Sequence, residues 1–231
     1  MRMRHWILIA GLVAGLGCSD GGADDACGMD NSFPAICPGG AIEGDYEIMN
    51  AADAEAIACC MTVTGTLDIA GSRSCVDDTS LTSVSLAQLT TTGNLTVGSQ
   101  GGCTHGETPT ALTSLDFPAL ISGSIRIENS PVLRSLNLPM LTSGGVLVLG
   151  STALTSLSLP MLTSSDGGFG VFGSTTLTSF SVPLLTTVTG QFGIYRNAAF
   201  ETSLAQAVRD QLTAAPLTTL ICGNKSGTAC P

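Results

Sequence analysis

Few residues of this chain have the type and spacing that a reaction needs. Downstream of residue 17 there is a single histidine, His105, close to Cys103 and Glu107 in a segment between two sequence repeats. An imidazole beside a thiol and a carboxylate could bind a metal or act as a base, but an isolated histidine of this kind is more typical of an exposed loop. Serine and threonine are abundant, yet the G-x-S-x-G nucleophile motif does not occur. We therefore expect no nucleophilic site, no metal site and no cofactor.

Two acidic residues, Asp116 and Glu128, are the candidates for polysaccharide-cleaving chemistry. Such chemistry requires carboxylates or basic groups gathered on one face. Each of these residues stands alone among its counterparts in the other repeats, which are Asn137, Ser158 and Ser181 for Asp116, and Leu149, Phe172 and Tyr195 for Glu128. The sequence therefore predicts a protein that is not an enzyme, with a carbohydrate-active β-helix enzyme as the less favoured alternative.

The position of Glu128 also carries the clearest binding signal. Its counterparts are apolar or aromatic in three successive repeats, although aromatic residues make up only 4% of the chain. Exposed apolar patches often mark interaction sites. The alternative is that these side chains fold into a corner or under the carboxyl-terminal segment. The candidate binding face consists of Leu147, Leu149, Phe172 and Tyr195.

A repeated segment positions these residues. LTSVSLAQL begins at Leu81, and similar segments begin at Leu112, Leu133, Leu154 and Leu177. The spacing is 21 or 23 residues, except for a step of 31 where SQGGCTHGETPT is inserted after the first copy. Within each copy, apolar residues at the fourth and sixth places alternate with Ser, Asp or Asn, which indicates a strand with one buried face. Proline follows in four copies and should end that strand.

The second half of each repeat predicts another short strand. A glycine stands two residues before two apolar residues that alternate with outward ones, and the same signature begins earlier, at Gly65. The inward pairs are Leu67/Ile69, Leu95/Val97, Ile125/Ile127, Val146/Val148, Phe169/Val171 and Phe192/Ile194. Such a unit cannot bury its own apolar face, but stacked units can. We therefore predict an all-β solenoid, a β-helix of about six coils with a period of 21–23 residues.

Short helices are expected at both ends of this solenoid. The first covers 50–60 with Asn50 as its N-cap, and the second has Thr202 or Ser203 as its N-cap and runs to about Ala214. Helices at these places would cover strand edges that otherwise remain unpaired.

The amino terminus has the features of a secretion signal. Residues 1–17 combine two early arginines with an apolar run of ten residues, too short to span a bilayer. AGLGC then resembles a bacterial lipobox, with Gly15 where leucine is usual, and predicts lipidation of Cys18. The alternative is simple cleavage that leaves a free periplasmic protein. Ser19, in place of Asp, favours the outer membrane by analogy with other lipoproteins.

Cysteine usage agrees with export. Nine cysteines leave eight if Cys18 is acylated, an even number that suits an oxidising compartment. Cys75 and Cys103 occupy equivalent places on adjacent coils and are predicted to pair. The other expected bonds are Cys222–Cys230 and a pair in which Cys27 and Cys37 each bind one of Cys59 and Cys60, with that connectivity open. A zinc site at these thiols is disfavoured because no histidine lies nearby.

The charge excludes some partners. Loss of Arg2 and Arg4 with the signal leaves 6 basic against 18 acidic residues, a net charge of −12. Phosphates of nucleic acid would be repelled, and so would anionic lipid surfaces. We expect no nucleic-acid partner, and contact with the membrane only through the lipid anchor.

The pattern LTSLxLPxLTSxxGxLxI, preceded by DYEIMNAADAEAIACCMTVTGTLDI, resembles the receptor L-domain superfamily over Asp45–Cys230. That group includes ligand-binding L domains of insulin and epidermal growth factor receptors and fungal GPI-anchored cell-wall proteins. The resemblance implies a leucine-rich-repeat-like, right-handed β-helix with a helix closing each end. The expected regions are a signal peptide (1–17), an acidic Gly-rich tether (18–44), an amino-terminal cap (45–64), the repeats (65–200), and a carboxyl-terminal cap helix with a disulfide loop (201–231).

The expected function follows from this organisation. We expect a non-catalytic, outer-membrane-anchored lipoprotein, in the periplasm or at the cell surface, that displays a face for a protein or glycan ligand. The alternative is a purely structural protein of the cell envelope.

Overall fold

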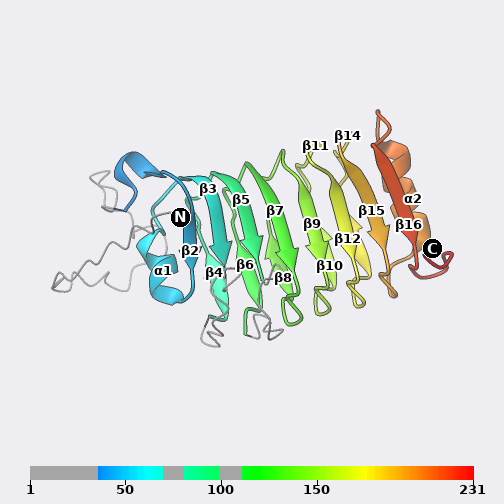
Figure 1. Cartoon of the computed structure of the whole chain (residues 1–231), viewed down its shortest axis with the longest axis horizontal. Helices are drawn as coiled ribbons and strands as arrows, with labels where there is room; N and C mark the ends of the chain where they lie inside the picture. The colour runs from blue at the N-terminus through cyan, green and yellow to red at the C-terminus, as the bar shows by residue number, and fades with distance from the viewer. Residues whose placement is uncertain (1–35, 70–80, 99–110) are drawn as a thin grey trace, which may run out of the picture.

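Parallel β-sheets dominate the computed structural model, which describes residues 36–69, 81–98 and 111–231 (Figure 1). The longest sheet has nine strands, and every pairing within it is parallel. Its order is β1 (Ala41–Ile42), β3 (Thr62–Ile69), β5 (Thr91–Val97), β7 (Ser122–Glu128), β9 (Val146–Leu149), β12 (Phe169–Phe172), β15 (Gln191–Tyr195) and β16 (Thr218–Cys222), with β2 (Tyr46–Ile48) also pairing with β3.

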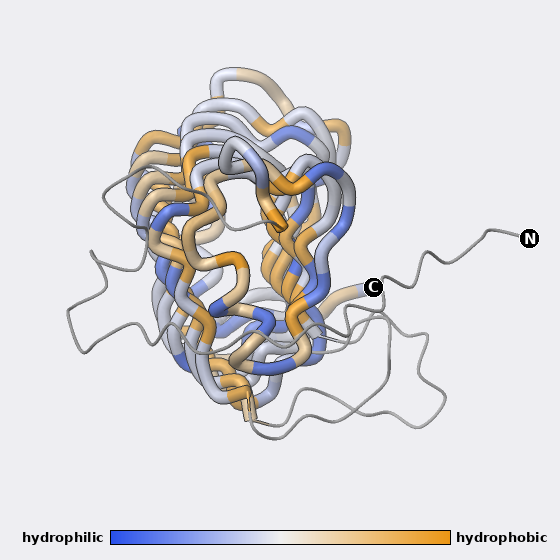
Figure 2. The backbone as a smooth tube through the Cα atoms, turned by 90° about the vertical axis from the view of Figure 1, so that its left-hand side faces the viewer, coloured by the Kyte–Doolittle hydropathy of each residue, from blue (hydrophilic) through white to orange (hydrophobic). Residues whose placement is uncertain are grey.

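A second parallel sheet contains the first strand of each repeat. Its order is β4 (Ser83–Ser85), β6 (Ser114–Asp116), β8 (Ser135–Asn137), β10 (Ser156–Ser158) and β13 (Ser179–Ser181). A shorter pair joins β11 (Ser164–Ser165) to β14 (Thr187–Val188). The chain thus alternates between sheets, and each layer lies behind the last around a shared interior (Figure 2). The arrangement is β-helix-like, in agreement with the repeat pattern.

Strand register places equivalent residues of successive repeats side by side. Leu115 pairs with Leu136, for example, and Val146 pairs with Phe169. The predicted inward pairs of the long sheet are at most 1% exposed, and the predicted apolar positions of the second sheet are at most 8% exposed apart from Phe180. Phe180 is partly buried and stacks on Phe200, with ring centroids 4.8 Å apart. Burial of each such side chain contributes about 1.5–3 kcal/mol.

A threonine column satisfies the backbone where the repeats turn a corner. The Thr142 hydroxyl donates to the Ile121 carbonyl at 3.0 Å, and Thr163 donates to the Thr142 carbonyl at 3.1 Å. Thr186 donates to Thr163 in the same way, at 3.3 Å. Each threonine therefore ties its own layer to the layer before it, which gives this exposed column a structural role.

A second corner, which the sequence analysis missed, follows the strands of the long sheet from β5 onward. The residue after the strand has positive φ in every described layer from β5 onward: Gly98, Asn129, Gly150, Gly173, Arg196 and Gly223. A buried polar residue comes next in the described layers from β7 onward: Ser130, Ser151, Ser174, Asn197 and Asn224. This two-residue signature marks where each layer turns away from the sheet.

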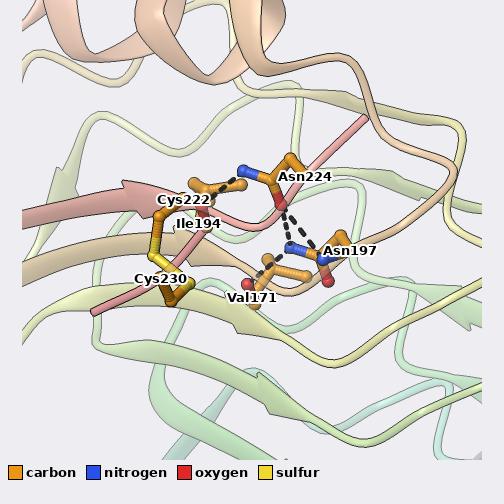
Figure 3. The surroundings of a disulfide bond; sticks show 6 residues. All are labelled: Val171, Ile194, Asn197, Cys222, Asn224 and Cys230. Atoms are coloured by element: carbon orange, nitrogen blue, oxygen red, sulfur yellow. Dashed lines mark hydrogen bonds between the residues drawn. A yellow bond between two sulfur atoms is a disulfide. The ribbon is translucent and has the colours of Figure 1, made fainter. Parts of the chain in front are cut away.

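The two asparagines of this corner form a buried network near the carboxyl terminus (Figure 3). The Asn197 side-chain amide donates to the Val171 carbonyl at 2.9 Å and to Asn224 Oδ1 at 3.2 Å. Asn224 in turn donates to the Ile194 carbonyl at 2.6 Å. The network links three successive layers, so the last strands are held by side chains as well as by the backbone ladder.

Helix α1 (Ala51–Ala56) closes one end of the stack and begins as predicted. Asn50 is its N-cap, and Asn50 with Asp53 forms a capping box. The helix ends at Ala56 rather than Cys60, and Ile57 and Cys60 are buried in the core. Burial of these two side chains requires the chain to leave the helix and enter the first layer.

Helix α2 (Thr202–Gln211) lies against β16 at the other end (Figure 1). Its N-cap is Glu201, not Thr202 or Ser203 as predicted, because the Thr202 hydroxyl donates to the Lys225 carbonyl instead. A hydrogen bond from Lys225 lowers the pKa of the Glu201 carboxyl. The helix ends at Gln211 rather than near Ala214, because Thr213 continues the threonine column.

The long sheet extends beyond the predicted repeat region at both ends. Strand β16 follows α2, in a segment expected to hold only a helix and a disulfide loop. On the other side, the short helix η1 (Pro38–Gly40) and β1 fall within the expected tether. The difference at the amino end follows from Cys37 and Ile42, which are 0% and 7% exposed and therefore belong to the core.

Two disulfides lie near the ends of the stack, and both use predicted cysteines. Cys37 binds Cys60, and Cys222 binds Cys230, with Cα atoms 5.9 Å and 4.9 Å apart. Cys59 is also disulfide-bonded. The signal peptide, Cys18, Cys27, Cys75, Cys103 and His105 lie outside the described residues.

Replacement of Asn197 by alanine tests the asparagine network. The change leaves the Ser174 N–H and the Val171 carbonyl without this partner in the interior, so we expect the free energy of unfolding to fall by about 2–4 kcal/mol. Asn137→Ala is the control, because Asn137 is exposed and its hydrogen bond to the Asp116 carboxylate lies at the surface, so the change should cost only about 0.5–1 kcal/mol. Urea unfolding measures both, and equal losses would contradict a special role for the buried network.

Candidate functional site

The predicted binding face is brought together on the outer side of the long sheet. Strand register aligns Leu149 with Phe172 and Phe172 with Tyr195. Leu147 lies one outward position earlier and pairs with Gly170. All four predicted side chains are partly buried, so they form a surface stripe rather than part of the core. Tyr195 pairs in turn with Cys222, so β16 lies beside the stripe and does not cover it.

The two aromatic rings of the stripe stack on each other. The ring centroids of Phe172 and Tyr195 are 4.2 Å apart, and the ring planes differ by 28°. A pair in this arrangement is worth about 0.5–1.5 kcal/mol beyond its buried area. Parallel pairing of β12 and β15 enforces the stack, because equivalent outward residues of adjacent strands must lie side by side.

Two glycines make room for the Phe172 ring, and the sequence analysis did not single them out. A Cβ atom on Gly170 would lie 2.4 Å from Phe172 Cζ, and one on Gly193 would lie 2.6 Å from Phe172 Cε1. Neither glycine has a positive φ, so space for the ring, and not backbone strain, explains the residue type. The visible signal was a glycine at the same place in FGVF and FGIY.

A hollow of about 270 Å³ adjoins the stripe. Gly145 and Gly168 expose backbone in it, and Leu147 and Phe172 form its apolar side. The polar residues that line the hollow are Asn94, Thr96, Ser124, Arg126, Asp166 and Gln191. The hollow thus combines an apolar side with amide, hydroxyl and charged groups, the combination found in small-molecule binding sites. Repeat analysis found Leu147 and Phe172 but missed its polar rim.

Charges at the rim are partly compensated. Arg126 forms an ion pair with Glu128, whose side chain is 11% exposed against 46% for Arg126. Asp166 is exposed. Thr96 is 7% exposed, and its hydroxyl makes no hydrogen bond within the described part of the chain. The described charged groups at the rim are therefore the Arg126 guanidinium, which is neutralised by Glu128, and the Asp166 carboxylate. The rim does not carry several charges of one sign.

The candidate carboxylates for catalysis are not brought together. Asp116 lies on β6 of the second sheet, where it accepts a hydrogen bond from the Asn137 amide at 2.6 Å. Glu128 lies on β7 of the long sheet and is paired with Arg126. Over 36–69, 81–98 and 111–231, no group of three or more His, Cys, Asp or Glu residues is arranged to hold a metal ion. None of the described helices has the length and apolar character to cross a membrane.

Substitution of Gly170 by alanine tests the seating of the Phe172 ring. We expect the added methyl group to lower the free energy of unfolding by about 1–3 kcal/mol, because it collides with the ring. In a protein that already carries Phe172→Ala, the same substitution should cost less than half as much. Urea unfolding of the two single variants and the double variant measures this coupling. Additive losses would contradict the contact.

Comparison with known proteins gave no match to a family model, to a curated protein or to a solved structure.

Proposed function

We propose that this chain is an exported, lipid-anchored recognition protein whose binding site is the hollow and aromatic stripe on the long sheet. The observation that carries the proposal is the seating of Phe172 over Gly170 and Gly193. Two adjacent strands give up outward side chains so that one ring can lie on the sheet. On an ordinary solvated face, polar side chains would occupy these outward positions. The seated ring instead creates a preformed apolar surface beside polar groups.

The proposed scaffold is a right-handed β-helix of about six coils, of receptor L-domain type, closed by α1 and α2. Parallel pairing of each repeat with the next supports it, since successive strands can pair in this way only through crossover connections. Crossovers between parallel strands are right-handed in nearly all proteins. The threonine column and the buried network of Asn197 and Asn224 would add side-chain hydrogen bonds between successive layers. These bonds would make the frame stiff.

Export and anchoring are supported by residues 1–17, by the lipobox-like segment before Cys18 and by the cysteines. The bonds Cys37–Cys60 and Cys222–Cys230 are typical of proteins that leave the cytosol. A lipid on Cys18, followed by the acidic segment, would hold the domain at the outer membrane, on its periplasmic side or at the cell surface. The anchor provides the contact with the membrane, and the acidic body adds none.

The proposed mechanism is display rather than catalysis. A stiff parallel stack holds the stripe and the hollow in their binding geometry before a ligand arrives, so little conformational entropy is lost on binding. The available carboxylates suit this role better than hydrolysis, because Asp116 and Glu128 belong to different sheets and both have partners. The ligand would be a glycan or a protein of the envelope or its surroundings.

A structural role in the envelope is the second candidate, and one observation favours it. Met140, Met161 and Leu184 follow the strand-ending proline in successive repeats and are 47%, 41% and 45% exposed. This row, the corner ridge, could pack copies of the protein side by side. If so, sedimentation velocity should show association that rises with concentration and that Met161→Lys abolishes. Sedimentation that does not change with concentration or with Met161→Lys would count against the structural role.

The anchor is tested by the mass of the amino-terminal peptide from membranes of expressing cells. We expect a peptide that begins at Cys18 and carries acyl chains, and we expect Cys18→Ser to move the protein out of the membrane fraction. Substitution of Ser19 by alanine is the control and should leave the acylated peptide in place. An unmodified peptide with another first residue would remove the anchor from the proposal.

A further inference from the structure

We infer that the hollow on the long sheet binds a neutral saccharide chain that lies across the strands from β5 to β15. This inference rests on the proposed recognition function and specifies the class of ligand. Four features of the site support a saccharide: the chemistry of its lining residues, its charge, the pairing of its backbone groups, and the spacing of its strands. The alternative ligand of a comparable surface is a polypeptide.

The lining offers the two kinds of contact that a sugar ring requires. A pyranose has apolar C–H faces surrounded by hydroxyl groups that both donate and accept hydrogen bonds. Leu147 and Phe172 provide an apolar side for the first. Asn94 and Gln191 provide amides for the second, because an amide both donates and accepts. A purely apolar ligand would leave these amides without partners and would lose affinity for that reason.

Charge selects a neutral sugar over an acidic one. Among the described residues that line the hollow, Arg126 is the only basic one, and it is already paired with Glu128. Asp166 adds a carboxylate at the rim that forms no ion pair with another described residue, and the chain as a whole is acidic, with a net charge of −10. A uronic acid or a phosphorylated sugar would meet this carboxylate, and the described lining offers no unpaired cation to offset the repulsion. The hydroxyls of a neutral sugar can instead donate to Asp166.

Backbone geometry favours a saccharide over an extended peptide. Peptides commonly bind sheets by adding a strand to a free edge, where unpaired backbone groups are available. The hollow instead lies on the face of the sheet, between strands whose backbone groups are paired on both sides: the Val146 N–H, for example, donates to the Gly168 carbonyl at 3.1 Å. Recognition at this place must use side chains and the shape of the glycine-lined floor.

Strand spacing gives the ligand its direction. Successive strands lie about 4.8 Å apart, which is comparable to the length that one pyranose unit adds to an extended chain. The lining residues come from β5, β7, β9, β12 and β15, so they repeat along the stack. A linear chain that crosses the strands can therefore place successive rings over successive layers, next to the aromatic stripe.

Titration with defined oligosaccharides tests the inference. The purified protein is titrated by calorimetry with cellohexaose, laminarihexaose, chitohexaose and mannohexaose, with hexagalacturonate as the acidic comparison and a neutral Ser–Leu hexapeptide as the polypeptide comparison. We expect at least one neutral hexaose to bind, and to do so equally well at low and high salt, because no ion pair is formed. Hexagalacturonate and the peptide should not bind.

Variants locate the binding. Phe172→Ala and Gln191→Ala should each weaken the neutral saccharide about tenfold or more, which corresponds to about 1.4 kcal/mol. Met161→Ala is the matched control, since Met161 is 41% exposed on the corner ridge and does not line the hollow, and its affinity should be unchanged. Gln191 is exposed, so Gln191→Ala remains informative if Phe172→Ala destabilises the fold.

An independent optical signal comes from Tyr195. The one tryptophan, Trp6, lies in the proposed signal peptide and is lost with it, so Tyr46→Phe leaves Tyr195 as the only strong emitter of the mature protein. Because Tyr195 stacks on Phe172, which lines the hollow, saccharide binding should change its emission.

Three outcomes would overturn the inference. Failure of every neutral hexaose to bind would do so, as would binding that neither Phe172→Ala nor Gln191→Ala weakens. Binding of the peptide that depends on Phe172 would replace the saccharide by a polypeptide and leave the recognition role standing. The anchor is tested separately by the amino-terminal peptide, so its failure and that of the ligand class are distinguishable.

Discussion

Parallel pairing between successive repeats is the constraint on which this structure depends. Each strand donates its backbone hydrogen bonds to the layers before and after it, so a residue must lie beside its counterpart one repeat away. Equivalent positions of successive repeats therefore form columns across the sheets, such as the apolar columns of the core, the threonine column, and the outer column in which Leu149, Phe172 and Tyr195 follow Glu128. The core, the threonine corner and the outer stripe are three results of this one rule.

The candidate site lies where glycine replaces larger residues at outward positions of the long sheet. Outward positions hold larger residues on β5 and β7, but glycine stands just before β9 (Gly145) and within β12 and β15 (Gly170 and Gly193), and the missing side chains leave the hollow and the seat for Phe172. The ion pair with Glu128 neutralises Arg126, the one basic residue among the described residues of the lining, so the proposed binding would depend on shape and hydrogen bonding rather than on charge.

Most of the buried apolar positions could be predicted from the sequence, because the alternation within each strand and the repeat length can be read from the sequence directly. Leu95, Val97 and their counterparts alternate as a half-buried strand must, and the register then follows from the repeat length. The stripe was predictable for the same reason, since Phe172 and Tyr195 occupy one place in adjacent repeats. Strand β16 was not, because its sequence lacks the preceding glycine, although Gly223 and Asn224 repeat the corner that Arg196 and Asn197 form.

Contacts between residues of different repeats could not be predicted from the sequence. Thr202 has the chemistry of an N-cap, yet its hydroxyl donates to the Lys225 carbonyl, because the segment that follows β16 returns to that place. In the same way, the reason for a glycine at position 193 on β15 becomes visible only when the Phe172 ring of the neighbouring strand β12 is seen above it. Secondary-structure propensity reflects a residue's own segment. The roles of these residues depend instead on the groups that a neighbouring layer places beside them.

Proton chemical shifts of the two glycines test this account most directly. If the Phe172 ring lies over the sheet, the Hα protons of Gly170 and Gly193 should be shifted upfield by the ring current and should show nuclear Overhauser contacts to the Phe172 ring. Glycine shifts near their unfolded values, with no contact to that ring, would contradict the seated aromatic stripe and with it the proposed binding face.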